Sequence, residues 1–425
     1  MIRQTAALII GQAVGQFSRL LNLGAGGTWP GELALSIDPH ILKNLAGHIR
    51  KGIVIVAGTN GKTTTTLMIK TILEANGNSV INNSSGANLI NGITASLIRQ
   101  ADIWGRLNCD YAVLETDENS LPAIVEEITP NAVVCLNLFR DQLDRYGEVD
   151  VITEKWALAI KNMNKKTALI LNSDDPQIAF LGKKYAGKTV YFGLNVKKLQ
   201  KYSFEHATDS IFCPNCGRRL KFAAIYYSHL GWWQCLKCGL KRPDPEFFNW
   251  ESPLPGLYNK YNTQAAAAVA KTLGVEDGLI AKSLKKVSPA FGRQEELVHQ
   301  GKPLKLMLSK NPAGFNESLR TVIGLKAKNI LLVLNDRIPD GRDVSWIWDV
   351  DFEMIPAKVQ ITVAGDRALD LGLRMKYAGL KYAVETVLSN AINKAAGQAE
   401  EKLYVLPTYS AMLDIRKIIS GKKIL

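Results

Sequence analysis

The chain of 425 residues is 47% hydrophobic and 21% charged, and it carries a formal net charge of +13. This length predicts about two or three domains with ample core. No apolar run is as long as a membrane span, which argues against an integral helical membrane protein. The positive charge favours anionic partners, whether nucleic acid, phosphorylated substrates or an anionic membrane surface.

Residues 1–50 are expected to form an N-terminal segment that packs on the next domain. An apolar stretch at 6–10 is followed by the polar residues Gln12, Gln16 and Ser18, and no small-residue cleavage signal comes after it. This pattern predicts an amphipathic helix rather than a secretory signal, and therefore a cytoplasmic protein.

Residues 52–70 contain the strongest functional signal. The run 53–57 is apolar and β-branched, which predicts a buried parallel strand. A tight polar turn and the start of a predicted helix follow in the order Gly58-Thr59-Asn60-Gly61-Lys62-Thr63-Thr64. A glycine turn between strand and helix directs backbone N–H groups at a phosphate, while Lys62 adds positive charge and the Thr63 hydroxyl can bind magnesium. An ordinary glycine turn is the alternative, because the general phosphate-loop pattern has a glycine where Val56 stands.

The run 111–115 predicts a second buried strand, which ends in the carboxylate of Glu115. An acid at that strand end can reach a magnesium ion held by Thr63. Glu115 is the first candidate, with Asp117 and Glu118 in reserve, and a solvated loop acid is the alternative. Strand-like runs followed by polar or acidic residues recur at 131–146 and 167–176, so we predict a doubly wound α/β sheet.

Four of the six cysteines form two Cys-x-x-Cys-Gly turns, with 18 residues between the pairs: Cys213 with Cys216, and Cys235 with Cys238. This spacing is typical of a zinc ribbon, whereas disulfides are disfavoured in a cytoplasmic chain. Four cysteine ligands leave no open position, so the expected zinc is structural and lies in an insertion at 205–245. Cys109 and Cys135 lie in or beside apolar runs and are expected in the core.

An alanine-rich helix is predicted around residues 264–268, preceded by Asn259 and Asn262. These asparagines are three apart and share a helix face. An asparagine amide offers the donor and the acceptor that an adenine edge needs, although a helix N-cap is the alternative for either residue. Arg293 follows shortly afterwards, and a lone arginine at such a position is usually a surface residue.

The order of these motifs resembles that of the Mur ligases and folylpolyglutamate synthases over residues 50–296. The resemblance implies a central ATP-binding domain at 51–299, with Lys62 and Thr63 on the phosphates and magnesium. It further implies Glu115 on magnesium, Asn262 on adenine and Arg293 on phosphate.

Two positions depart from the pattern of that family. Most relatives have a histidine where Gln142 stands, as a ligand of a second magnesium ion. Many also use a carbamylated lysine, and Lys155 lies about two residues short of that position. The second magnesium site therefore remains open.

Three later motifs, at 311–314, 335–353 and 406–413, narrow the resemblance. Together with the inserted ribbon they are similar to the MurT-type synthetase subunits of the Mur ligase family, which implies a Rossmann-like α/β domain at 300–425. From the residues alone, the acid-rich loop at 335–353 is a candidate site or a structured surface loop packed over Trp346 and Trp348.

The resemblance implies ATP-dependent amidation of the α-carboxylate of D-glutamate in the lipid II stem peptide, through an acyl phosphate that ammonia attacks. The chain has five histidines, none in a glutaminase motif, so we expect a GatD-type glutaminase partner to supply ammonia. In that family the synthetase subunit lends an acid to orient the glutaminase histidine. Asp349 is the first candidate, followed by Asp343 and Asp351. We expect no nucleic-acid partner, and a location at the inner face of the membrane.

Two other function classes stay open on the sequence. A peptide-bond-forming ligase of the Mur or folylpolyglutamate type would share the ATP site but accept an amino acid as its second substrate. A nucleic-acid-binding ATPase would account for the zinc ribbon and the positive charge, although no helicase motifs accompany the phosphate loop.

Overall fold

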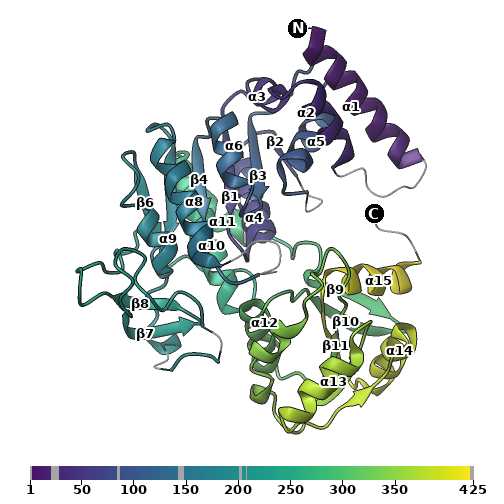
Figure 1. Ribbon diagram of the computed structural model, residues 1–425. Coiled ribbons are helices and arrows are strands. Elements are labelled where there is room, and N and C mark those ends of the chain that lie inside the picture. Colours follow the sequence, from purple (N-terminus) through teal and green to yellow (C-terminus); the bar gives the residue numbers. More distant parts are fainter. Residues whose placement is uncertain are drawn as a thin grey trace.

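The computed structural model describes residues 2–20, 28–83, 87–141, 148–200, 203–206 and 208–421. Figure 1 shows N-terminal helices at one end, a central sheet with helices around it, a small hairpin at its edge and a second α/β unit that carries the C-terminus. This arrangement confirms the predicted fold class.

The N-terminal helices are α1 (Ile2–Leu20), α2 (Trp29–Ile37) and α3 (Ile41–Ala46). Helix α2 packs against both α1 and α5 (Ile90–Gln100). The approach to α5 is close, because a Cβ on Gly31 would lie 1.9 Å from the Asn91 carbonyl oxygen. The segment is therefore joined to the central sheet through α5.

The central sheet has the strand order β2-β3-β1-β4-β5-β6, and every neighbouring pair is parallel. Its strands are β1 (Gly52–Ala57), β2 (Val80–Asn82), β3 (Tyr111–Thr116), β4 (Ala132–Cys135), β5 (Ala168–Asn172) and β6 (Thr189–Phe192). The remaining helices of this unit are α4 (Lys62–Ala75), α6 (Leu121–Glu127), α8 (Val149–Asn162), α9 (Pro176–Leu181), α10 (Leu257–Thr272) and α11 (Asp277–Leu284).

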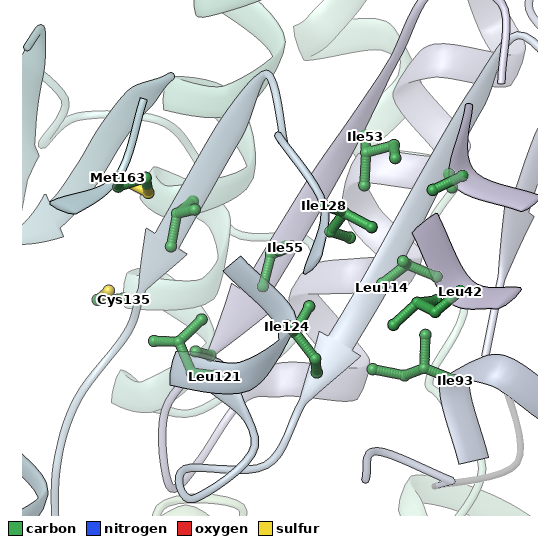
Figure 2. Packing of buried hydrophobic residues seen from close by; sticks show 14 of the residues in the cluster. Leu42, Ile53, Ile55, Ile93, Leu114, Leu121, Ile124, Ile128, Cys135 and Met163 are labelled. Atoms are coloured by element: carbon green, nitrogen blue, oxygen red, sulfur yellow. The ribbon is translucent and has the colours of Figure 1, made fainter. Parts of the chain in front are cut away.

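Alternating side chains of β1 enter two different cores, as the period of a strand requires. Ile53 and Ile55 join a cluster with side chains from α3, α5, α6 and α8, including Ile124 (Figure 2). Val54 and Val56 join a second cluster with α4, α10 and α11. Helices therefore cover both faces of the sheet, which explains why its strands are apolar throughout.

The ribbon insertion lies between β6 and α10. After a short 3-10 turn, η1 (Lys197–Leu199), it forms an antiparallel hairpin of β7 (Lys221–Tyr227) and β8 (Leu230–Gln234). Tyr226 of this hairpin is fully buried, and its hydroxyl donates to the Leu194 carbonyl at 3.0 Å. The insertion is thus packed into the central unit.

The C-terminal unit has the strand order β13-β12-β11-β14-β10-β9, with only β9 antiparallel to its neighbour among the described strands. Strand β9, which falls within the 51–299 range, pairs with β10 of this second sheet. The elements are β9 (Arg293–His299), β10 (Lys302–Met307), α12 (Pro312–Gly324), β11 (Asn329–Val333), η2 (Ser345–Asp349), η3 (Phe352–Met354), β12 (Gln360–Ala364), α13 (Ala368–Tyr377), β13 (Ala383–Val384), α14 (Leu388–Gln398), β14 (Leu403–Pro407) and α15 (Tyr409–Ser420). Helices α12 and α13 contribute to one core of this sheet, and α14 and α15 to the other.

Among the described residues, no helix has both the length and the apolar character that crossing a bilayer requires.

Cys109 and Cys135 are buried in the core, as predicted.

Candidate functional site

The phosphate loop leaves β1 at Gly58 and enters α4 at Lys62. Gly58 and Gly61 have φ angles of +139° and +92°, which glycine adopts at the lowest cost. Asn137, just after β4, fixes the turn between them. Its side-chain oxygen accepts from the Asn60 N–H at 2.9 Å, and its amide nitrogen donates to the Asn60 carbonyl at 3.0 Å. The loop is therefore held in shape by polar contacts from the next strand of the sheet.

Lys62 lies in a buried position at the first turn of α4. Its Nζ donates to the Gly58 carbonyl and lies 3.4 Å from the Glu118 carboxylate. Burial opposes ionisation of Glu118, but the positive charges of Lys62 and Lys310 and two hydrogen bonds outweigh it and lower the pKa of Glu118. Glu118, a reserve candidate for magnesium, thus serves as the carboxylate partner of the loop lysine.

Thr63 and Glu115 meet at the same edge of the sheet. The Thr63 hydroxyl donates to the Glu115 carboxylate at 2.8 Å. Burial raises the pKa of Glu115, against the Thr63 hydrogen bond and the charges of Lys62 and Arg293. Hydroxyl and carboxylate oxygens are ligands that Mg²⁺ accepts, so this pair fits the ion that the sequence predicted there. Asp117 instead accepts a hydrogen bond from the backbone N–H two residues further on.

The C-terminal unit adds Lys310, which sequence reasoning did not single out, and Asn311 of the motif at 311–314. Lys310 follows β10 and donates to the buried carboxylate of Asp141, an ion pair between the two units. Asn311 caps α12 through the Gly314 N–H at 2.8 Å, and its side-chain amide exchanges hydrogen bonds of 3.1 and 3.2 Å with that of Asn60. The only sequence signal for Lys310 is its place between a strand and an Asn-Pro helix start.

A cavity of about 50 Å³ lies beside the phosphate loop, with walls from both units. Its lining includes Gly61, Thr63, Asn262, Tyr258, Arg293 and Lys310. Asn262 lies directly against the loop, because a Cβ on Gly61 would come within 2.2 Å of the Asn262 side-chain oxygen. Neither Asn259 nor Asn262 caps α10, since the N-cap is Gly256. The structure therefore brings Asn262 and Arg293 to the loop, while the adenine and phosphate roles remain predictions.

Asp349 ends η2 and lines a second cavity of about 160 Å³ together with Arg140, Asp141 and Lys310. Its carboxylate is half-exposed and lies 3.5 Å from the Arg140 guanidinium. Asp343 accepts from the Ser345 N–H at 2.8 Å within its own loop. Asp343 and Asp349 thus both line this cavity, and Lys310 lines it and the phosphate-loop cavity.

The four ribbon cysteines converge, with all four sulfur atoms within 4.8 Å of one another. Both turns have the same backbone, in which the N–H four residues after the first cysteine donates to its carbonyl, at 2.9 Å for Gly217 and 3.1 Å for Gly239. Four thiols at this separation fit a tetrahedral ion such as zinc, and no position is left for a substrate.

The two residues that depart from the family pattern at a second magnesium site are Lys155 and Gln142. Lys155 is exposed on α8, with its amine 3.5 Å from the Asn119 side-chain oxygen. Gln142 lies outside the described residues.

Comparison with known proteins supports the motifs along the whole chain. The Mur ligase middle domain matches residues 56–270, and the MurT ligase C-terminal domain matches residues 308–412. The chain is 35% identical over 439 residues to the MurT subunit of lipid II isoglutaminyl synthase (glutamine-hydrolyzing) from Staphylococcus aureus, covering 97% of this chain and 96% of that protein. The subunit of the same name from Streptococcus pneumoniae is 35% identical over 431 residues, covering 95% of each chain.

A solved structure shares the fold. The pseudomurein peptide ligase type C from Methanothermus fervidus superposes with a TM-score of 0.69 at 24% identity, covering 89% of this chain and 80% of that one. The sequence matches extend over both α/β units and the ribbon between them. The chain therefore belongs to the MurT family of Mur ligases, the ATP-dependent ligases of peptidoglycan synthesis.

Proposed function

We propose that this chain activates the α-carboxylate of D-glutamate in the lipid II stem peptide and converts it to D-isoglutamine. The carboxylate oxygen attacks the γ-phosphorus of ATP, and ADP leaves. Ammonia then attacks the carbonyl carbon of the acyl phosphate, phosphate departs with the bonding electrons, and the nitrogen loses a proton. Phosphorylation replaces a poor leaving group with a good one.

The observation that carries this proposal is the cluster of charged groups around the phosphate loop. Arg293 and Lys310 line the cavity beside the loop, and Lys62 begins the helix that follows the loop. In this proposal the three cations supply positive charge to the phosphoryl group during transfer. Thr63 and Glu115 would hold the magnesium ion, which supplies charge neutralisation on the phosphates. Residues of both units line the cavity that the proposal uses.

A glutaminase of the GatD type is the proposed source of ammonia. The relatives from Staphylococcus aureus and Streptococcus pneumoniae are named as subunits of a glutamine-hydrolysing enzyme, which supports a second subunit here. Asp349 is the proposed contribution of this chain to that half-reaction, because its half-exposed carboxylate is available to an incoming histidine. The zinc that we propose for the ribbon is structural.

The proposed location is the inner surface of the membrane, where lipid II lies. Large exposed apolar side chains on the N-terminal helices support it: Ile9, Ile10 and Phe17 on α1, and Trp29 and Leu33 on α2. Trp104, which is 72% exposed, lies on a loop next to α1. Aromatic and aliphatic side chains exposed on an amphipathic helix suit a lipid interface.

The decisive experiment is to incubate the chain with lipid II, ATP and ammonium, and to weigh the product by mass spectrometry. Conversion of one carboxylate to an amide supports the proposal. An adduct with a supplied amino acid would instead indicate a peptide-bond-forming ligase. ATP hydrolysis that depends on RNA or DNA would indicate a nucleic-acid-dependent ATPase.

A further inference from the structure

A short segment enters the ribbon from the central unit, and we call its described residues, 203–206 and 208–209, the strap. The strap is attached to the ribbon. The Phe204 ring meets the Phe222 ring of β7 edge-on, with centroids 5.1 Å apart. Phe222 in turn packs against the cluster that contains Cys213 and Cys235. Folding of a small metal ribbon is coupled to its metal, so the strap contacts a part of the chain that a bound zinc ion would order.

Glu205 of the strap joins the hairpin to the C-terminal unit. Its carboxylate accepts from the Ser228 N–H at 2.9 Å, in the turn between β7 and β8. The same carboxylate contacts the Arg320 guanidinium at 2.6 Å and accepts from the Asn316 amide at 3.0 Å, both on α12. Its side chain is only 9% exposed, so these charge-assisted contacts form away from bulk water, where they are strong.

His206 of the strap contacts the loop that follows η2. Its Nδ1 lies 2.5 Å from the Asp351 carboxylate, two residues after Asp349. Asn316 holds the same loop, because its side-chain oxygen accepts from the Asp351 N–H at 2.9 Å. The strap and α12 therefore both form contacts with Asp351.

Asp209 is linked to Asp349 by Arg140 of the central unit, which contacts both carboxylates. Its carboxylate accepts from the Arg140 Nε at 2.5 Å and from the Arg140 backbone N–H at 3.0 Å. The other arm of that guanidinium lies 3.5 Å from the Asp349 carboxylate. Arg140 is thus oriented by the strap, and its positive charge attracts Asp349.

We infer that the strap and Arg140 are positioning elements for the Asp349 loop. The position of Asp349 therefore depends on the metal-loaded ribbon. This assignment deepens the proposed function, since it gives the ribbon a role in the glutamine-dependent half-reaction. Asp209, Arg140 and Glu205 are positioning residues in this scheme, and none of them is assigned contact with substrate.

Hydrogen exchange on the isolated full chain tests the coupling without relying on the proposed reaction. Asp209→Asn, and separately removal of zinc with a chelator, should raise amide exchange in residues 344–351 by about threefold or more, because the loop loses its anchors. Residues 388–398 in α14 should not change. The matched control is Asp277→Asn, which removes a carboxylate from the exposed pair with Lys271. Unchanged exchange at 344–351 in both samples, or an equal rise through the whole C-terminal unit, would overturn the inference.

Turnover with the glutaminase partner supplies a second readout that general destabilisation would not reproduce. Asp209→Asn should lower glutamine-dependent amidation by roughly tenfold while ammonium-dependent amidation stays near wild type, and Asp209→Glu should restore most of the loss. Equal loss with both nitrogen donors, or no loss with glutamine, would contradict the positioning role. If the wild type amidates nothing with either donor, the proposed function fails, while the exchange result still decides the coupling.

Discussion

Lys62 and Glu118 form a buried ion pair at the mouth of the phosphate loop, 3.4 Å apart. The lysine charge therefore has a neighbouring carboxylate as its counter-ion. A phosphate would compete with Glu118 for the same ammonium group. The pair explains how a charged lysine remains stable in a position with only 8% exposure.

Lys62→Ala is expected to lower ATP-dependent amidation by at least about 100-fold, because a positive charge on the transferring phosphoryl group is lost. The same change leaves Glu118 without its lysine and should lower the free energy of unfolding by about 3 kcal/mol. Amidation kinetics and urea unfolding measure the two effects separately.

A double variant controls for the stability loss. Lys62→Met combined with Glu118→Gln removes both charges and should recover most of the unfolding free energy without recovering turnover. A folded Lys62→Ala protein that amidates at near wild-type rate would show that the ATP site lies elsewhere.

Sequence reasoning found Lys62, Thr63 and Glu115 because each follows directly from a strand and its adjoining turn. It did not select Lys310, whose contact with Asp141 joins residues 169 positions apart. Local patterns carry no signal for such a contact, which exists only once the two sheets are placed together. Asp141 belongs to a run of the Mur-ligase-like pattern at 131–146, but that pattern gave it no ion-pair partner.

The His206–Asp351 contact predicts a pH dependence. The hydrogen bond to Asp351 and its negative charge raise the pKa of His206 above 6.5, with a smaller raising effect of Glu353 and a lowering effect of Arg374. A raised folded-state pKa stabilises the fold fully below pH 6.5, and this contribution is lost as the pH rises through the folded pKa.

Histidine ring resonances followed by NMR from pH 5 to 9 would test this at single-residue level, with His206→Gln to assign the signal. The His206 titration should lie above the ordinary value. Asp351→Asn should return it toward that value. A His206 that titrates normally in the wild-type chain would indicate that the contact does not persist in solution.

At the scale of elements, the ribbon behaves as part of the central unit. Its cysteines share a small core with Ala179 and Phe180 of α9, and the Trp233 indole donates to the Ser173 carbonyl at 3.1 Å. The ribbon spacing was readable because metal ligation requires all four cysteines at fixed local offsets. The packing of the ribbon on α9 could not be predicted from the sequence, because the contact surface consists of ordinary apolar residues.

We predict one zinc ion per chain in protein prepared without chelators, measured by elemental analysis. Cys216→Ser should reduce the zinc content and lower the free energy of unfolding by roughly 2–4 kcal/mol, because an incomplete ligand set no longer holds the hairpin. Cys109→Ser, in the core away from the ribbon, is the matched control and should retain its zinc. Absence of zinc from the wild-type chain would disprove the ribbon assignment.

The apolar patterns in the sequence predicted the strands of the central sheet but not the edge strand β9 of the second sheet. The apolar runs of β1, β3, β4 and β5 predicted buried parallel strands, because helices cover both faces of that sheet. Strand β9 has only two apolar residues, Leu297 and Val298, and lies at the edge of the other sheet, paired with β10. Strand β9 thus joins the second sheet, although it lies within the predicted range 51–299.

At the scale of the molecule, the two units meet where the chemistry is proposed. Asn60 of the phosphate loop and Asn311 at the start of α12 exchange two amide hydrogen bonds, and Lys310 pairs with Asp141 beside them. Asp349 lies on the far side of that ion pair. The half-exposed Asp349 is thus apart from the proposed phosphoryl-transfer site.

This separation yields a prediction about nitrogen donors. Asp349→Asn, assayed with the glutaminase partner, should lose glutamine-dependent amidation by on the order of 10³-fold, because an amide cannot fix the tautomer of a catalytic histidine as a carboxylate does. Amidation with free ammonium should persist, since Lys62, Thr63 and Glu115 are untouched. Both rates would be measured on one preparation by mass spectrometry of the lipid product.

Asp366→Asn is the matched control, because Asp366 is also a half-exposed acid of the C-terminal unit paired with an arginine, Arg337. It should leave both rates unchanged. Equal loss with glutamine and with ammonium in Asp349→Asn would assign Asp349 to the synthetase site, through Arg140 and the cavity that it shares with Lys310. Full activity with glutamine would remove Asp349 from both roles and direct the search to Asp343, whose carboxylate accepts hydrogen bonds within its own loop.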